Sequence, residues 1–204
     1  MTMNFTDPGE VRLSGQNPFM AVYDDPQAPA PSSRVNIWHV QYCPEAGPGN
    51  VLFFVSNDLT GGEVRVYSDN IRLTRWLQEE IPANPWSWAD NTLPVREARF
   101  ETLGDPRSFV TSRVVSRDDD ISLSWFDFLP AFAGVTAPNP DRHTTHGHYA
   151  VYIPAERIRV TLNGVDIKGQ PVPSPNPAWN GAPSAMLCYA ESWVRPKGQS
   201  GPSK

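Results

Sequence analysis

Three of the four histidines of this 204-residue chain, His143, His146 and His148, fall in the single stretch HTTHGH. Imidazole nitrogen is a common metal ligand, and it also titrates near neutral pH, so the cluster suits metal or acid/base chemistry. In an extended strand, residues two apart project from the same face, so His146 and His148 could converge on one point. With His143 or the distant His39 as third ligand, the stretch would hold a single divalent metal ion that activates water.

Cofactor-independent acid/base chemistry is the interpretation that we favour for this cluster. A cupin-type metal site would add a glutamate shortly after the H-x-H pair, but the next acid is Glu156, beyond Pro154. A histidine can accept a proton, and a carboxylate among aromatic side chains, its pKa raised by desolvation, can donate one. In an extended strand HGHYAVY (146–152), His146, His148 and Tyr152 would lie on one face, around the small Ala150. The candidate catalytic residues are His39, Asp127, His146, His148 and Tyr152.

Aromatic residues indicate what such a site would bind. The chain has 7 tryptophans and 22 prolines, and tryptophan supplies a large apolar face with one polar N–H, whereas frequent prolines prevent long helices. The loop PANPWSWADN (82–91) carries two tryptophans that either close over a ligand or simply pack. The predicted ligand is a small apolar or aromatic molecule. The candidate substrate-binding residues are Trp38, Trp86, Trp88, Trp125, Tyr149, Tyr189 and Glu191.

The orientation of the two candidate acids stays open from the sequence. In ISLSWFDFL (121–129), Asp127 alternates with Leu123 and Trp125, so it either points inward or lies where the strand leaves the sheet. A buried aspartate would need a partner such as Arg113 or a histidine. Glu191 shares a face with Tyr189, but the opposite face of that strand is small and apolar and makes the better core.

Alternating hydrophobicity predicts strands through most of the chain and one helix. The helix is SDNIRLTRWLQEEI (68–81), which begins at Ser68 or Asp69 as N-cap, ends at Pro82, and packs on a sheet as a lid or plug. Asn163-Gly164 predicts a type I′ turn. The clearest predicted strands and hairpins span 34–43, 51–56, 63–68, 93–103, 108–117, 121–129, 158–169 and 184–195.

These elements predict an all-β fold. About nine to eleven strands with one short helix favour an antiparallel β-barrel, lipocalin-like or related, with a ligand cavity inside. We expect a single domain over 1–196, with a proline-rich loop at 24–33 and a disordered tail at 197–204.

Composition excludes several classes of partner. The net charge of −5 and the pI near 5.3 argue against nucleic acid, and there is no apolar run of roughly 20 residues to span a membrane. The first residues lack a basic and an apolar region of a signal peptide, and Cys43 and Cys188 suit reduced buried thiols, so we expect a cytoplasmic protein. A homodimer stays open.

Three functions remain after these exclusions. No nucleotide-binding motif and no G-x-S-x-G nucleophile motif is present. We expect a lyase, isomerase or hydratase without an organic cofactor, in which His146 or His148 moves the proton, Tyr152 orients the substrate and Asp127 partners a histidine. The alternatives are a metal-dependent enzyme that uses the three clustered histidines, and a non-catalytic protein that binds hydrophobic ligands.

Overall fold

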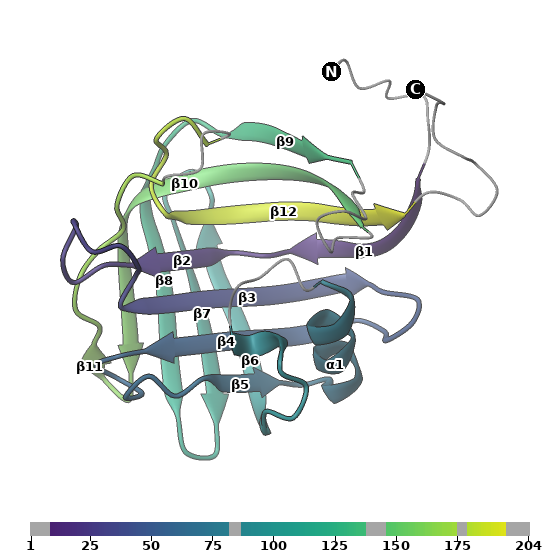
Figure 1. The fold of residues 1–204 in the computed structure, drawn as a ribbon, viewed down its shortest axis with the longest axis horizontal. Coiled ribbons are helices and arrows are strands. Elements are labelled where there is room, and N and C mark those ends of the chain that lie inside the picture. The colour runs from purple at the N-terminus through teal and green to yellow at the C-terminus, as the bar shows by residue number, and fades with distance from the viewer. Residues whose placement is uncertain (1–8, 82–86, 138–145, 175–178, 195–204) are drawn as a thin grey trace.

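The protein is mostly sheet, and the described part of the chain contains one short α-helix (Figure 1). The computed structural model describes residues 9–81, 87–137, 146–174 and 179–194. The helices are α1 (Ile71–Glu80) and a 3₁₀ turn, η1 (Ser87–Ala89). The strands are β1 (Glu10–Gln16), β2 (Phe19–Val22), β3 (Ser33–Tyr42), β4 (Gly49–Ser56), β5 (Arg65–Ser68), β6 (Val95–Asp105), β7 (Phe109–Ser116), β8 (Asp120–Phe128), β9 (Phe132–Thr136), β10 (Gly147–Leu162), β11 (Val165–Asp166) and β12 (Ala185–Val194).

The strands form one large twisted sheet that folds into two layers. The first layer contains β1–β5, β9, β12 and the first half of β10, and the strands of the second layer, β6–β8, run across it (Figure 1). The 16-residue β10 joins the layers, because its residues 147–154 pair with β12 and its residues 155–162 pair with β8. The prediction of a β fold with one short helix is confirmed.

One pairing departs from the antiparallel arrangement that the sequence predicts. The start of β6 pairs in parallel with β5, and from Ala98 onward β6 pairs antiparallel with β7. A parallel pair needs a long crossover rather than a tight turn, and α1 and η1 lie in the connection between β5 and β6. The connection that contains the predicted helix therefore allows β6 to run parallel to β5.

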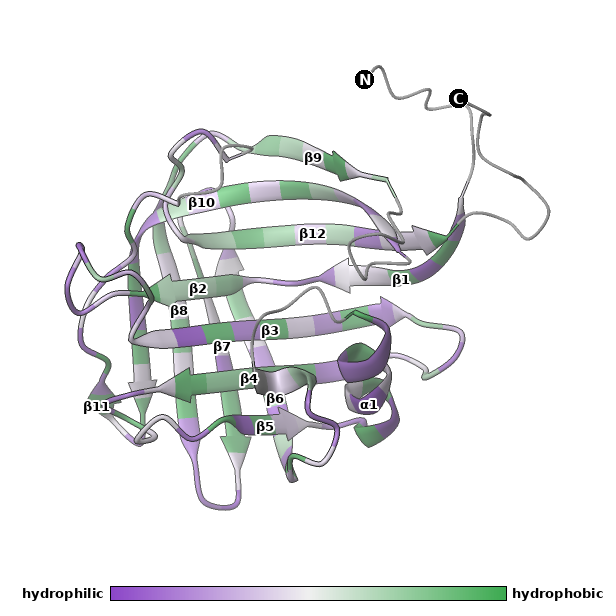
Figure 2. Cartoon of the chain, in the orientation of Figure 1, coloured by the Kyte–Doolittle hydropathy of each residue, from purple (hydrophilic) through white to green (hydrophobic). Residues whose placement is uncertain are grey.

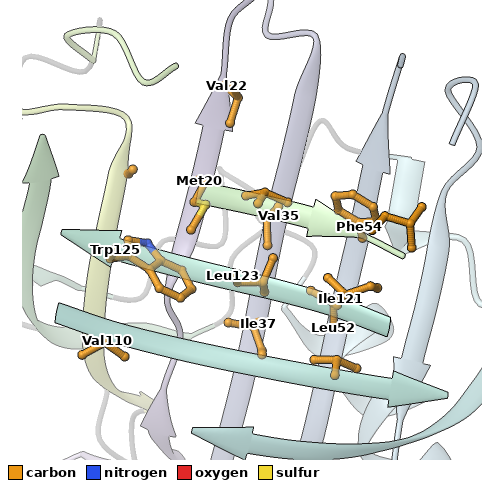
Figure 3. Packing of buried hydrophobic residues seen from close by; sticks show 14 of the residues in the cluster. Met20, Val22, Val35, Ile37, Leu52, Phe54, Val110, Ile121, Leu123 and Trp125 are labelled. Carbon is orange, nitrogen blue, oxygen red and sulfur yellow. The ribbon is translucent and has the colours of Figure 1, made fainter. Parts of the chain in front are cut away.

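The main core lies between the two layers. Ile37, Leu52 and Phe54 project from the first layer toward Leu123 and Trp125 of the second (Figure 3). Each of these side chains is at most 2 % exposed, and burying a side chain of this size contributes about 1.5–3 kcal/mol. The Trp125 indole N–H donates to the carbonyl oxygen of Phe19 at 3.4 Å. Trp125, predicted to bind substrate, is thus part of the interlayer packing.

Helix α1 covers the opposite face of the first layer. Leu73 and Leu77 are buried in a cluster with Phe53 of β4 and Trp88 of η1, so the helix packs on the sheet as predicted. Its N-cap is Asn70, whose Oδ1 accepts the Leu73 N–H at 3.1 Å.

The prediction of Ser68 or Asp69 as N-cap is wrong for a local reason. The Ser68 hydroxyl donates to the carbonyl of Asn50, and the Asp69 carboxylate accepts two hydrogen bonds from Asn50. Both side chains are therefore occupied by β4, and the cap falls on the next polar residue, Asn70.

A third cluster makes β10 and β12 apolar on both faces. Ala150, Tyr152, Met186 and Cys188 are buried away from the interlayer core, and Figure 2 shows apolar residues along β9 and in the part of β10 beside it. Burial on both faces explains why alternation alone does not identify the core face of the last strand.

Other local predictions are confirmed. Asn163 and Gly164 both have positive φ angles, 52° and 80°, as a type I′ turn requires, and Leu162 pairs with Val165. Cys43 and Cys188 are both buried free thiols.

Within the described ranges, no helix is long and apolar enough to cross a membrane.

Candidate functional site

Three of the predicted substrate-binding residues, Tyr149, Tyr189 and Glu191, line one groove of about 470 Å³. Tyr149 pairs with Glu191 across β10 and β12, and Tyr189 pairs with Val151. These side chains continue the face that carries the interlayer core, since Leu187 and Ile153 lie on the same sides of the two strands. The groove is the part of this face that the core leaves open.

The wall of the groove is apolar and aromatic with a few polar groups. Val151 is 45 % exposed there, and the Tyr149 ring stacks on Trp193 at 5.5 Å between centroids. The polar groups include the carboxylate of Glu191, the hydroxyl of Ser14 and the amides of Gln16 and Gln41. Such a lining of apolar walls with few polar groups is typical of small-molecule sites.

His39 is not part of the groove lining, but it neighbours two of the lining residues, Gln16 and Gln41. It pairs with Gln16 across β1 and β3, and it precedes Gln41 by two residues on the same face of β3. The rings of His39 and of Phe100 in the second layer are nearly perpendicular, and their centroids are 6.4 Å apart. The sequence places His39 on an apolar strand face, and the structure adds that the groove begins beside it.

A hydrogen-bonded chain orients the His39 ring. Both the backbone N–H and the side-chain NH₂ of Asn50 donate to the Asp69 carboxylate at 2.6 Å. The amide oxygen of Asn50 therefore faces His39, and it lies 2.7 Å from His39 Nδ1. Because an oxygen can only accept, Nδ1 carries the proton and donates it. Nε2 is then the acceptor nitrogen of this imidazole.

Two hydroxyl groups face the acceptor nitrogen. Thr102 Oγ1 is 3.3 Å and Ser112 Oγ is 3.4 Å from His39 Nε2, and the two hydroxyls are 3.0 Å apart. Ser112 is buried, whereas Thr102 is exposed. Burial lowers the pKa of His39, although the Asn50 hydrogen bond raises it. Burial therefore favours the neutral form of the imidazole, in which Nε2 can accept a proton.

His146 lies elsewhere, against the last turn of α1. The side chain is 8 % exposed, its ring meets Trp76 edge to face at 5.9 Å, and it hydrogen-bonds the backbone of Glu80. Burial lowers its pKa. The contacts of His146 place it at the C-terminal end of the helix, where a histidine also satisfies a terminal carbonyl.

His148 and Tyr152 share a face of β10, as predicted, with Ala150 between them. That face is opposite to the one that carries Tyr149. Tyr152 is buried against Phe132 and Trp179, with ring centroids 5.3 and 5.9 Å away, and burial raises its pKa. Burial likewise lowers the pKa of His148. The structure thus does not bring this pair together with Tyr149, Tyr189 and Glu191.

The three-histidine metal hypothesis depends on a residue outside the described ranges, His143. Among the residues that are described, no group of three or more histidine, cysteine, aspartate or glutamate side chains is arranged to hold a metal ion. The metal alternative therefore stays a prediction about the HTTHGH stretch.

Asp127 is exposed at the end of β8, the second of its two expected orientations. Its φ angle is 53°, and it forms an ion pair with Arg157. The expected partner, Arg113, instead binds Asp120 at 2.7 Å. The Arg157 hydrogen bond lowers the pKa of Asp127, which is opposite to the shift that a proton donor at neutral pH needs.

The remaining tryptophan candidates serve packing or lie outside the described ranges. Trp38 packs on the cluster beneath α1, and Trp88 stacks on Phe53 at 5.7 Å. Trp86 is not among the described residues. Trp38 and Trp88 therefore hold α1 and η1 on the sheet.

Sequence reasoning did not connect Asn50, Asp69, Thr102 or Ser112 with His39, and it considered Asp69 only as a candidate N-cap. A signal for their existence was present, because a half-buried histidine on an apolar strand face needs hydrogen-bond partners. The sequence does not show which residues these partners are, because they are distant along the chain: Thr102 is 63 residues from His39.

Comparisons with known proteins leave the function open. No protein-family model and no curated protein matches the sequence. A solved structure, acetoacetate decarboxylase from Legionella pneumophila, superposes with a TM-score of 0.42 and 10 % identity, over 96 % of this chain and 88 % of that chain. A likeness at this level carries no argument about the activity of this protein.

Proposed function

We propose that the groove binds a small apolar or aromatic molecule and that His39 moves a proton on it without an organic cofactor. The reaction would be of the lyase, isomerase or hydratase type. The observation that carries the proposal is an imidazole that Asn50 and Asp69 hold in one tautomer, on the strand face next to Gln16 and Gln41 of the groove lining. A base positioned by a fixed hydrogen-bond partner is a recurring arrangement for proton transfer.

The groove offers different contacts to different parts of a ligand. Tyr149, Tyr189 and Val151 supply apolar surface, while Gln16 and Gln41 can hydrogen-bond a carbonyl or hydroxyl group. A volume of about 470 Å³ suits a molecule of one to three rings.

The role of Glu191 in this proposal is to bind rather than to transfer the proton. Its carboxylate is exposed and accepts a hydrogen bond from the Ser14 hydroxyl at 3.5 Å. It can therefore accept a hydrogen bond from a ligand hydroxyl or amine.

The proposal includes the closed β-barrel that the sequence predicts. The pairings of β10 with β12 and of β6 with β5 would close the two layers into a barrel, with the groove at its open end. Binding at the mouth of a barrel is a common arrangement for small ligands, and here the interior itself is filled by the core.

Binding is tested with aromatic and terpenoid-like compounds by thermal shift and by tryptophan fluorescence. We expect the substitution Val151→Trp to fill the groove and abolish binding, since Val151 lies in its wall. The matched control is Val165→Trp, at another exposed valine, which lies on β11 outside the groove (59 % exposed, against 45 % for Val151). Equal loss of binding in both variants would contradict a site in the groove.

Proton transfer is tested by incubating protein and ligand in D₂O and following C–H exchange by NMR. We expect His39→Gln to bind the ligand with near-normal affinity but to lose exchange by about 10²-fold or more, the usual contribution of a general base. Glu191→Gln should weaken binding and keep exchange. Exchange that persists in His39→Gln rules out His39 as the base, and binding without exchange in the unmodified protein identifies a carrier.

A further inference from the structure

A second cavity, of about 380 Å³, lies on the other face of the first layer. It is lined by Phe19 of β2 and by Arg34 and Asn36 of β3, which alternate with the core residues Met20 and Val35. We call it the aromatic cleft. Because alternate residues of a strand project to opposite faces, the side chains of the aromatic cleft point away from the interlayer core and from the groove.

Tryptophan and phenylalanine rings form the walls of the aromatic cleft. Phe19 and Trp179 lie 5.4 Å apart between ring centroids, and Trp179 also contacts Tyr152. Trp88 is fixed by its stacking on Phe53. Each of the wall rings thus packs on at least one other aromatic ring, so the cavity is preformed rather than created by loose side chains.

Arg34 is the only charged residue in the described lining of the aromatic cleft. Burial lowers its pKa to about 10, so the guanidinium stays charged at neutral pH in a partly dehydrated position. The attraction between opposite charges strengthens when water is excluded. The chain as a whole carries a net charge of −5, so this cation stands out as a local feature of the cavity.

Asn36 adds hydrogen-bond donors next to this cation. Its Oδ1 accepts the side-chain N–H of Asn17 at 2.6 Å, and this contact fixes the amide so that its oxygen is engaged. The NH₂ group of Asn36 is then the part of this amide that can contact a ligand, and like the guanidinium it only donates.

We propose that the aromatic cleft binds a small aryl carboxylate, with its ring between Trp88 and Trp179 and its carboxylate on Arg34 and Asn36. A guanidinium matches a planar carboxylate through two parallel hydrogen bonds. The apolar walls favour an anion that carries a ring over an inorganic anion, because an inorganic anion has no apolar surface to bury there. A volume of about 380 Å³ accommodates one or two fused rings. This site is independent of the groove and of the proposed proton transfer.

The test uses 1-naphthoate as the probe and 1-naphthalenemethanol as its uncharged counterpart, measured by titration calorimetry on the full chain. We expect 1-naphthoate to bind with one-to-one stoichiometry. The substitution Arg34→Gln should weaken naphthoate by at least about tenfold, the usual effect of a charged hydrogen bond, and leave naphthalenemethanol unchanged. Val151→Trp, which fills the groove, should leave naphthoate binding intact.

A second variant keeps the test decisive if Arg34→Gln does not fold. Asn36→Asp can still accept the Asn17 hydrogen bond, but its negative charge would repel a carboxylate, so naphthoate should again weaken at least about tenfold. Absence of naphthoate binding to the unmodified protein overturns the proposal. Naphthoate affinity equal to that of the unmodified protein in both the Arg34→Gln and the Asn36→Asp variant also overturns it, and loss of binding in Val151→Trp would assign the probe to the groove instead.

Discussion

Two polar networks of this protein use an aspartate in different ways. The Asp119 carboxylate is 6 % exposed, and it accepts hydrogen bonds from Arg65 at 3.1 Å, Arg96 at 2.7 Å and Tyr67 at 2.7 Å. The Asp69 carboxylate is exposed, and it holds Asn50, which in turn holds His39. Both networks connect distant segments, but only the second ends at a titratable nitrogen beside a cavity.

The difference between the two networks lies in where the hydrogen bonds end. Arg65, Arg96 and Tyr67 all donate to the buried Asp119 carboxylate, and the two arginines also contact Glu63, so their donors are taken up by protein groups. The Asp119 network joins β5, β6 and the turn between β7 and β8. The Asp69 network directs its last acceptor, His39 Nε2, at an exposed hydroxyl. We infer that a network with all of its groups satisfied stabilises the fold, whereas a network with an open end can take part in chemistry.

The largest expected effect follows from removing the charge of Asp119. Asp119→Asn leaves Arg65 and Arg96 close together without their buried counter-charge, and the loss of one partner of a buried pair costs about 3–5 kcal/mol. The free energy of unfolding, measured by urea denaturation, should fall by about that amount. Asp120→Asn is the matched control, since this neighbouring aspartate makes an exposed ion pair with Arg113. Equal stability of the two variants would contradict a structural role for the Asp119 network.

Much of the fold is predictable because it rests on local patterns. Alternation predicts the strands, Asn163-Gly164 predicts its turn, and the helical spacing of Leu73 and Leu77 predicts α1. The Asp119 network is not predictable, because RDDD (117–120) offers three consecutive acids and only the turn geometry decides which one is buried. The parallel pairing of β5 with β6 is also a long-range outcome of the intervening helix.

The candidate site shows the same division between local and long-range information. Tyr189 and Glu191 share a strand face, so their proximity follows from alternation, and pairing with β10 adds Tyr149. The partners of His39 come from β4, β6 and β7, and no local pattern connects those strands to it. The sequence can therefore indicate a candidate histidine, but the tautomer of that histidine depends on the tertiary structure.

An intermediate effect concerns the pH dependence of stability. The folded-state pKa values of His39, His146 and His148 are all lowered by burial. Between the ordinary value near 6.5 and these lower values, the unfolded chain binds more protons than the folded chain. The stability of the fold should therefore be complete above pH 6.5 and decrease as the pH falls below it.

The substitution His39→Gln isolates the share of the Asp69 network in this pH dependence. Each unit by which a pKa is lowered corresponds to about 1.4 kcal/mol between the two protonation states. The urea midpoints of the unmodified protein and of the variant are compared at pH 7.5 and pH 5.5. We expect a smaller decrease in the variant, with the remainder due to the other two buried histidines. An identical decrease in both proteins would show that His39 is as easily protonated in the folded state as in the unfolded one.

The smallest expected effect concerns the ion pair of Asp127 and Arg157. This pair is neither buried like the Asp119 network nor connected to a histidine like the Asp69 network. Both side chains are exposed, and the pair joins the end of β8 to β10 at the surface. Because water and salt screen such a pair, Arg157→Ala should leave the urea midpoint unchanged within experimental error, at both low and high ionic strength. Arg96→Ala, which removes an arginine from the buried Asp119 instead, should lower the midpoint clearly. If the two alanine variants were destabilised alike, burial would not be what separates the structural network from the surface pair. The contrast between Asp119 and Asp69 would then have to rest on the position of His39 beside the groove alone.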